Sequence, residues 1–387
     1  MLGLDDDDLV LAEQEEMAAP LAQTPSLGLK QSAVRWLPGA ASADGAIAAA
    51  GSWDEYENGG EDQVALWSVR FEPGAEDAME AAEAEAVRIV CSSPHSGCVL
   101  GLAVAATAAG AAVFTASGAG GAACYSVEGG GAALSARWSE GTDAHAGVAA
   151  LGVCWNEHLG RLALVSEDGR LALIEAERAK RSLCVQSDEP SLGAVCWPSA
   201  HVAATAASCV LLWDVRQPAP APSLRLACAD GVPAHLAPQL HAVGVHSQRA
   251  HMFAAGSSGG EVYVWDARAP TAPVSAPSAA TRIDAHRSDV WEVRFAPSAY
   301  GDLLSCSSDG TLQAWTLSAL GFDEASRAAS REAAARLGFG AEEPLEPASR
   351  TLVEFERPVN SFDVSDAHGA LAAASDAEVL TFLDLRH

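Results

Sequence analysis

The stretch "RIDAHRSDVWEVRFAPSAYGDLLSCSSDGTLQAW", residues Arg282 to Trp315, decides the fold. Its segment "DVWEVRFAP" alternates as a half-buried strand does. The alternation predicts two sets of side chains on opposite faces: Val290, Glu292 and Arg294, and Trp291, Val293 and Phe295. "DLLSCSS" and "TLQAW" are two further short strands. The Asp309-Gly310 pair between them is a strong hairpin signal, because glycine adopts the positive φ of a tight turn. The stretch therefore predicts three antiparallel strands.

The same stretch holds the residue types of a hydrolase triad, but their context favours a structural role. No G-x-S-x-G sequence marks a nucleophile at a strand-to-helix turn. His286 precedes the first strand, Ser305 and Ser307 lie on the second, Asp309 lies in the hairpin, and Trp315 lies on the third. We expect a buried chain of hydrogen bonds from Trp to Ser to His to Asp, because buried polar groups must find partners.

The three-strand unit recurs along the chain. "VLLWDVRQ" (Val210 to Gln217) and "VYVWDARA" (Val262 to Ala269) are related, and "VALWSVR" (Val64 to Arg70) and "LQAWTLS" (Leu312 to Ser318) are weaker copies. A short apolar strand and a turn of small residues precede each copy. Seven units can be counted. Their spacing slightly exceeds the ~40–45 residues of a WD40 blade. The repeat predicts an all-β chain that forms a single seven-bladed WD40 β-propeller.

Two copies carry a W-D-x-R signature, which has two interpretations. The residues are Trp213, Asp214 and Arg216, and Trp265, Asp266 and Arg268. One interpretation is a fold element in which the arginine pairs near the edge of the blade. The other is a WD40 substrate receptor of a cullin ubiquitin ligase.

The ends of the chain and one insertion fall outside the repeat. Residues 1–20 include four consecutive aspartates and are expected to be a disordered acidic tail, so the propeller spans residues 21–387. The last unit has only three strands, and Leu21 to Lys30 is expected to supply its fourth, outer strand and to close the ring. Residues 319–347 are rich in alanine and predict a helix, or alternatively a flexible linker, inserted after blade six.

Composition and charge exclude several classes of function. The net charge of −28 disfavours nucleic acid and anionic membrane surfaces as partners. Nine cysteines without a C-x-x-C pair are typical of a reducing compartment. The segment from Ser96 to Val127 carries no charged residue, but its Gly, Thr and Ser favour two buried strands over a membrane span.

No motif for catalysis, for a cofactor or for a metal ion emerges from the sequence. The Gly-rich "GAGGAACYS" lacks the G-K-[S/T] of a phosphate loop, and the histidines form no H-E-x-x-H cluster. The chain is therefore expected to be a rigid platform for other proteins rather than an enzyme.

Four blade-length stretches, in order, resemble the 43-kilodalton WD40-repeat nucleoporin family. They are "VRWLPGAASADGAIAAAGSWDEYENGGEDQVALWSV", the region around "GEVYVWDARAPTAPVS", "AHRSDVWEVRFAPSAYGDLLSCSSDGTLQAW" and "VNSFDVSDAHGALAAASDAEVL". The resemblance covers most of residues 30–387 and is weaker in blades two and three. The acidic tail and the Ala-rich insertion depart from the family.

The resemblance implies a non-enzymatic scaffold subunit of the Y-shaped outer-ring complex at the nuclear pore. Such a subunit is a single propeller within a hetero-oligomer. It binds an α-solenoid nucleoporin of the short arm and neighbouring outer-ring nucleoporins, without inserting into the membrane. It supports nucleocytoplasmic transport and pore assembly.

Overall fold

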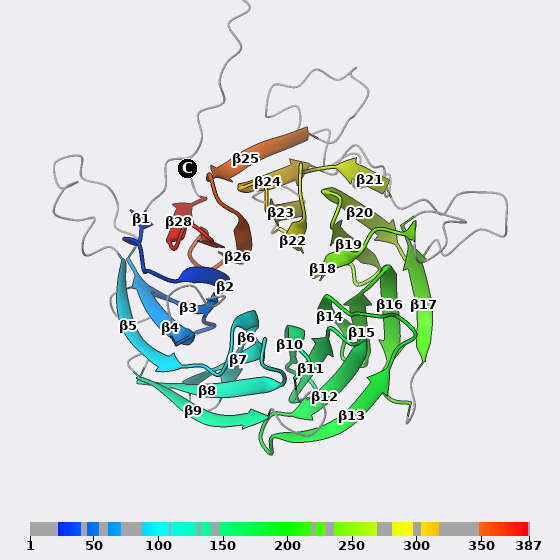
Figure 1. Cartoon of the computed structure of the whole chain (residues 1–387), viewed down its shortest axis with the longest axis horizontal. Helices are drawn as coiled ribbons and strands as arrows, with labels where there is room; N and C mark the ends of the chain where they lie inside the picture. Colours follow the sequence, from blue (N-terminus) through cyan, green and yellow to red (C-terminus); the bar gives the residue numbers. More distant parts are fainter. Residues whose placement is uncertain are drawn as a thin grey trace, which may run out of the picture.

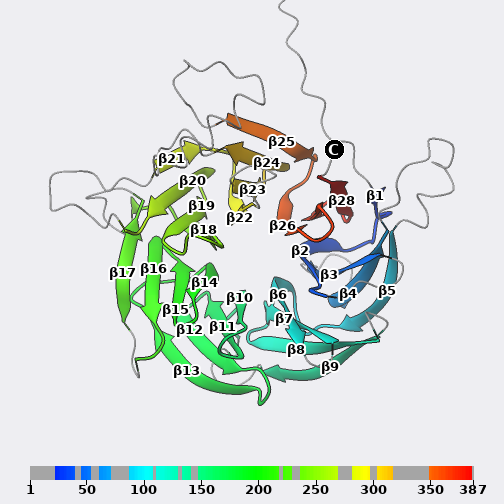
Figure 2. The same cartoon turned by 180° about the vertical axis from the view of Figure 1, so that it is seen from behind.

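The protein forms a ring of seven four-stranded antiparallel sheets around a central channel (Figures 1 and 2). The structure is a computed structural model, and it describes residues 22–39, 45–53, 61–70, 87–107, 110–129, 133–140, 147–217, 221–228, 236–268, 281–296, 303–316 and 348–385. The chain runs around the ring blade by blade, so the colours in Figure 1 follow the circle. The predicted all-β, seven-bladed propeller is confirmed.

The strands follow one another from the channel outward in each blade. Blade one contains β2 (Lys30–Trp36), β3 (Ala46–Trp53), β4 (Gln63–Val69) and β5 (Val87–Pro94). Blade two contains β6 (Val99–Thr107), β7 (Gly110–Ser117), β8 (Ala122–Glu128) and β9 (Ala133–Glu140). Blade three contains β10 (Ala150–Asn156), β11 (Arg161–Ser166), β12 (Arg170–Glu175) and β13 (Lys180–Gln186). Blade four contains β14 (Ala194–Ser199), β15 (Val202–Ala206), β16 (Cys209–Asp214) and β17 (Pro222–Ala227).

The remaining three blades complete the circle. Blade five contains β18 (Leu240–Val245), β19 (Met252–Ser257), β20 (Glu261–Asp266) and β21 (Thr281–Asp284). Blade six contains β22 (Val290–Phe295), β23 (Leu303–Ser307), β24 (Thr311–Thr316) and β25 (Ala348–Glu354). Blade seven contains β26 (Val359–Ser365), β27 (Ala370–Ser375), β28 (Leu380–Asp384) and β1 (Ala22–Gln23). We call the end of the ring at which the inner strands begin the entry end, and the opposite end the exit end.

The N-terminal segment reaches blade seven, but its pairing there is shorter than expected. Instead of a strand over residues 21–30, β1 has two residues and pairs with β28 through Ala22↔Phe382 and Gln23↔Thr381. The main-chain N–H of Leu27 then donates to Glu378. Lys30 already belongs to the inner strand of blade one. Strand pairing at the point of closure is thus limited to two residues.

The sequence analysis did not predict most of the outer, fourth strands, because their hydrophobic pattern is weak. The sequence units contain three strands, whereas each blade has four. Strand β13 alternates between exposed and half-buried residues, and β17 is similar. The second strands, in contrast, are buried along nearly their whole length, as β19 and β27 show. Only a strand covered on both faces produces the continuous apolar run that is easy to recognise.

The hydrophobic core is divided into seven clusters, each between two neighbouring blades. Between blades one and two, for example, Leu66 packs with Val113, and both are fully buried. Between blades six and seven, Leu304 packs with Phe362. Small residues, chiefly alanine, fill the second strands and allow the blades to pack closely.

The inner strands carry a bulge near the entry end. A register shift occurs there in β2, β6, β10, β18, β22 and β26. In β22 the shift lies between Val290 and Glu292, so Val290 and Val293 both enter the core. The strict alternation predicted for this strand is therefore wrong, because a bulge inserts one residue and reverses the faces. Glu292 and Trp291 line the channel as a result.

Glycine allows the inner strands of blades two to four to approach one another. A Cβ atom on Gly101 would lie 3.3 Å from the Cα atom of Gly152, and one on Gly152 would lie 3.2 Å from the Cα atom of Ala194. Both distances are tight for a side chain. At Gly310 the reason for glycine is instead its φ of 87°, which the Asp309-Gly310 hairpin requires.

Some expectations concern residues outside the described ranges. These are the disordered tail over residues 1–20 and the helical or flexible insertion over residues 319–347, and both stay predictions. The uncharged segment from Ser96 to Val127 spans β6, β7 and β8, which is one strand more than the two expected. Within the described residues, no helix has the length and hydrophobicity needed to cross a membrane.

Candidate functional site: the blade-six network and the central channel

The four residues singled out in blade six are joined by hydrogen bonds. The indole Nε1 of Trp315 donates to Ser305 Oγ over 2.8 Å. Ser305 Oγ lies 2.7 Å from His286 Nε2, and His286 Nδ1 lies 3.2 Å from Asp309 Oδ2. Ser307 instead donates to the carbonyl of Ser288. The chain of contacts runs from the third strand to the loop that enters the blade, as a structural network requires.

Burial determines the protonation of this network. It lowers the pKa of His286, whose side chain is completely covered, although the nearby Asp309 opposes this shift. Burial would raise the pKa of Asp309, but hydrogen bonds from the N–H of Arg287 and from Thr311 lower it below its usual value. At neutral pH the network therefore pairs a neutral imidazole with a carboxylate.

Partial copies of this network occur in two other blades. In blade two, His95 Nε2 lies 2.9 Å from Thr115 Oγ1, which corresponds to the His286–Ser305 contact. In blade four, the indole of Trp213 donates to Thr205 Oγ1 over 3.0 Å. The sequence analysis did not single out His95, because the third strand of its blade, β8, lacks the tryptophan found in the third strands of blades one, four, five and six.

The W-D-x-R residues form ion pairs within a single turn. Arg216 Nη2 lies 2.6 Å from Asp214 Oδ2, and Arg268 makes the same pair with Asp266 over 2.6 Å. The hydrogen bond from Arg216 lowers the pKa of Asp214 to about 2. Trp265 differs from Trp213 because its indole donates to the carbonyl of Ala227 in the preceding blade, over 3.0 Å. This geometry is that of a fold element near the exit end.

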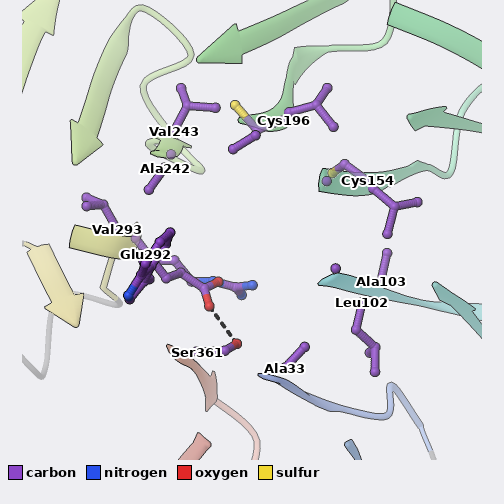
Figure 3. Close-up of a pocket in the computed structure, with 18 of the residues that line it drawn as sticks. Ala33, Leu102, Ala103, Cys154, Cys196, Ala242, Val243, Glu292, Val293 and Ser361 are labelled. Atoms are coloured by element: carbon purple, nitrogen blue, oxygen red, sulfur yellow. Dashed lines mark hydrogen bonds and ion pairs between the residues drawn. The ribbon is translucent and has the colours of Figure 1, made fainter. Parts of the chain in front are cut away.

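The inner strands surround a channel with a volume of about 560 Å³. One part of its wall is apolar and includes Leu102, Val243 and the thiols of Cys154 and Cys196 (Figure 3). Burial raises the pKa of both thiols above the usual value, so they are protonated at neutral pH. The opposite part of the wall, from blades six, seven and one, is charged.

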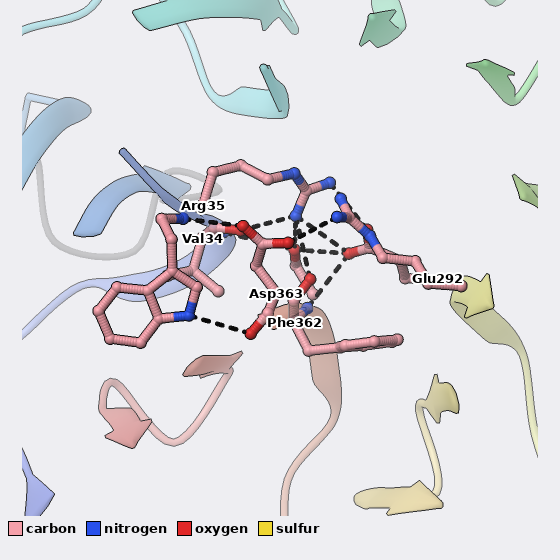
Figure 4. A network of polar contacts seen from close by, with 8 residues as sticks. Val34, Arg35, Glu292, Phe362 and Asp363 are labelled. Carbon is pink, nitrogen blue, oxygen red and sulfur yellow. Dashed lines mark hydrogen bonds and ion pairs between the residues drawn. The ribbon is translucent and has the colours of Figure 1, made fainter. Parts of the chain in front are cut away.

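Four charged side chains form a network on this part of the wall (Figure 4). Glu292 Oε1 of blade six lies 2.8 Å from Arg35 Nη2 of blade one and 2.7 Å from Arg294 Nε. Arg294 Nη1 lies 2.6 Å from Asp363 Oδ1 of blade seven. Ser361 of blade seven also donates to Glu292 over 2.7 Å. The network thus joins the last two blades to the first one.

Further hydrogen bonds connect the network to the backbone across the closure. Asp363 Oδ2 accepts the main-chain N–H of Trp36 over 2.8 Å, and the Trp36 indole donates to the carbonyl of Asp363 over 3.2 Å. Burial alone would raise the pKa of Glu292, but Arg294 and Arg35 outweigh it and lower this pKa to about 2. The pKa of Arg294, which burial would lower, is raised by Glu292 and Asp363. Glu292 and Arg294 are therefore both charged at neutral pH.

In the described ranges, no three or more His, Cys, Asp and Glu side chains come together as a metal site would require. The triad-like residues of blade six and the charged residues of the channel bond to one another and to the backbone.

The curated proteins to which this sequence is similar are nucleoporins. No protein-family model matches the sequence. The nucleoporin Nup43 of Homo sapiens is 29% identical over 309 residues, which cover 75% of this chain and 74% of the relative. Nup43 of Mus musculus is 33% identical over 158 residues, covering 40% of this chain and 38% of the relative. The nuclear pore complex protein NUP43 of Arabidopsis thaliana is 29% identical over 180 residues, covering 42% and 49%.

A solved structure supports the fold alone. One chain in a crystal structure of the mitotic checkpoint complex superposes with a TM-score of 0.64, over 99% of this chain and 97% of that one, at 14% identity. Such identity carries no functional argument. The match to human Nup43 along three-quarters of the sequence makes this chain similar to the Nup43 nucleoporins, and the complete ring agrees with the predicted propeller.

Proposed function

We propose that the protein is a non-enzymatic scaffold subunit of the outer-ring, Y-shaped complex of the nuclear pore. The observation that carries this proposal is the match to human Nup43 over 309 residues, which extends through most of the ring. Its homologues are nucleoporins and nuclear pore complex proteins in animals and a plant, and they place the protein at the nuclear pore.

The architecture supports a scaffold. Each blade packs on two neighbours through its own hydrophobic clusters, which makes a rigid body whose surface is available to other proteins. The partner that we propose is the α-solenoid nucleoporin of the short arm, with contacts to neighbouring outer-ring nucleoporins. The net charge of −28 suits a partner surface that is neutral or basic.

The alternative of a cullin ligase receptor is not favoured. It rested on the W-D-x-R residues, and the guanidinium groups of Arg216 and Arg268 pair with the aspartates of their own turns. The homologues are also nucleoporins rather than ligase subunits.

Affinity purification from the native cell tests the proposal. A scaffold contact of more than ~1,000 Å² should survive moderate salt, which screens only exposed charges. We expect outer-ring nucleoporins in near-equal amounts at low and at moderately high salt, identified by mass spectrometry. Recovery of a cullin adaptor without nucleoporins, or absence of the tagged protein from the nuclear rim, would contradict the proposal.

A further inference from the structure

Trp291 is a large aromatic side chain that remains 40% exposed at the entry end of the channel. Its orientation is fixed from two sides. The indole Nε1 donates to Ser308 Oγ over 2.6 Å, and the ring centroid lies 4.8 Å from that of His241. His241 is itself held by Asp289, with 3.2 Å between Nε2 and Oδ1. An exposed tryptophan held in place loses little side-chain entropy on binding, which is typical of an interface anchor.

The surroundings of Trp291 offer a recess rather than a flat surface. It occupies the bulge of β22. The matching bulge of the neighbouring inner strand β18 carries His241, and those of β6 and β10, in blades two and three, carry Leu100 and Leu151. These side chains, with Trp291, line the channel of about 560 Å³. A side chain entering from solvent would meet apolar and aromatic surface at the rim.

Among the residues that the structure describes, the loops at the two ends of the ring differ in charge. The pairing of Val290 with Ser307 places the hairpins between second and third strands at the entry end, together with the loops that lead into the inner strands. Exposed or half-exposed acidic residues of these loops include Glu61, Glu167, Asp188, Asp289, Glu356 and Asp376. The basic residues described in the same loops include Arg287 and Arg357. Described loops of the exit end carry Arg178, Arg216, Arg249 and Arg268 together with Glu157, Glu177 and Asp366, and Arg216 and Arg268 pair with the aspartates of their own turns.

We propose that the entry end of the channel is a docking surface for an extended basic segment of a partner protein. An arginine or lysine of that segment lies against the Trp291 ring, whose face attracts cations more strongly than other aromatic rings do. The acidic loops draw the segment to this end and not to the exit end. The assignment of this surface goes beyond the proposed scaffold role and does not depend on which protein supplies the segment.

Photocrosslinking in the native cell locates the segment. The full chain carries p-benzoylphenylalanine in place of Arg287, an exposed residue of the same entry loop, so that Trp291 is kept. The control carries it in place of Ile89, a 50% exposed residue of the outer strand β5. We expect position 287 to crosslink a segment rich in arginine or lysine that position 89 does not reach. An acidic segment, a nucleic acid, or no crosslink specific to position 287 would overturn the proposal.

Binding of the crosslinked segment, as a synthetic peptide, is then measured by calorimetry. We expect Trp291→Ala to weaken binding about tenfold or more, the loss typical of an anchor residue. Asp289→Asn should weaken it less, and Glu157→Gln, at an exposed site of the exit end, should leave it unchanged. Thermal melting of each variant separates loss of binding from loss of folding. Equal affinity of wild type and Trp291→Ala would overturn the proposal.

The outcomes separate this inference from the proposed function. Nucleoporins recovered with the intact chain, but no basic segment crosslinked at position 287, leave the scaffold role standing and refute the docking surface. A crosslinked basic segment from a protein unrelated to the pore, without recovery of nucleoporins, supports the docking surface and refutes the scaffold role.

Discussion

Asp309 holds the entry loop of blade six through both of its carboxylate oxygens. One oxygen accepts the main-chain N–H of Arg287 over 3.0 Å and lies beside His286. The other accepts the N–H and the hydroxyl of Thr311, over 2.9 Å and 2.7 Å. The residue types are those of a catalytic triad, but their partners identify a device that fixes a loop to a hairpin.

We expect Asp309→Ala to lower the free energy of unfolding by about 1–3 kcal/mol, because it leaves buried donors without their acceptor. Asp366→Ala, at an exposed position of the β26–β27 turn, is the matched control and should change it by less than ~0.5 kcal/mol. Urea unfolding followed by tryptophan fluorescence measures both. Equal stability of the two variants would show that the network contributes little.

Glu292 makes the stability of the ring depend on pH. Its pKa in the folded state is about 2, below the usual value for a glutamate. A depressed pKa adds stability that is fully present above the unfolded pKa and is lost as the pH falls toward the folded one. The contribution of Glu292 is thus complete above about pH 4.5 and declines toward pH 2.

We expect Glu292→Gln to destabilise the protein by ~3–5 kcal/mol at pH 7, because Arg35 and Arg294 stay buried without their shared carboxylate. The difference in unfolding free energy between wild type and variant should shrink between pH 4.5 and pH 3, since only the wild type loses the charge. Urea titrations at pH 7, 4.5 and 3 measure it. A difference independent of pH would contradict the assignment.

Strand β1 has only two residues, although it lies where the two ends of the chain meet in blade seven. It contributes two residue pairs to blade seven. Thr24 and Leu27 extend the contact: Leu380 donates its N–H to the hydroxyl of buried Thr24 over 3.0 Å, and Leu27 packs on the cluster between blades seven and one. The N-terminal segment therefore covers the edge of β28 with few bonds.

We expect deletion of residues 1–20 to leave the melting temperature almost unchanged, since no pairing of β1 is lost. Deletion of residues 1–28 should lower it by several degrees, because Thr24 and Leu27 lose their contacts and β28 gains an open edge. Differential scanning calorimetry measures the two transitions. Identical transitions would show that the closure does not depend on this segment.

The elements also show where sequence patterns stop being informative. The Asp309-Gly310 turn and the strands around it could be predicted, because turn chemistry and alternation act over a few residues. The bulge between Val290 and Glu292 could not, because it depends on how the inner strand meets its neighbour. Strict alternation puts Glu292 on the same face as Val290, which lies in the core. The sequence therefore did not indicate that Glu292 lines the channel.

For the whole molecule, the repeat predicted seven blades and their order, because each blade repeats one local pattern. The charged network in the channel was not predicted. Its members Arg35, Glu292 and Asp363 come from three blades, and Arg35 and Asp363 lie near opposite ends of the sequence. Only closure of the ring brings them together, so no spacing within the chain could signal them.

The seven clusters between blades have a mechanical consequence. Because every blade shares one cluster with each neighbour, including blade seven with blade one, the packing forms a hoop with no first or last member. The two ends of the chain are then only a break in the backbone of this closed ring, near the pairing of Gln23 with Thr381. Joining the two termini by a linker and cutting the chain at the β10–β11 turn instead would move the break in the backbone, while every cluster keeps both of its walls. Separating any two neighbouring blades would expose the hydrophobic cluster between them. The seven blades are therefore expected to unfold together rather than one at a time.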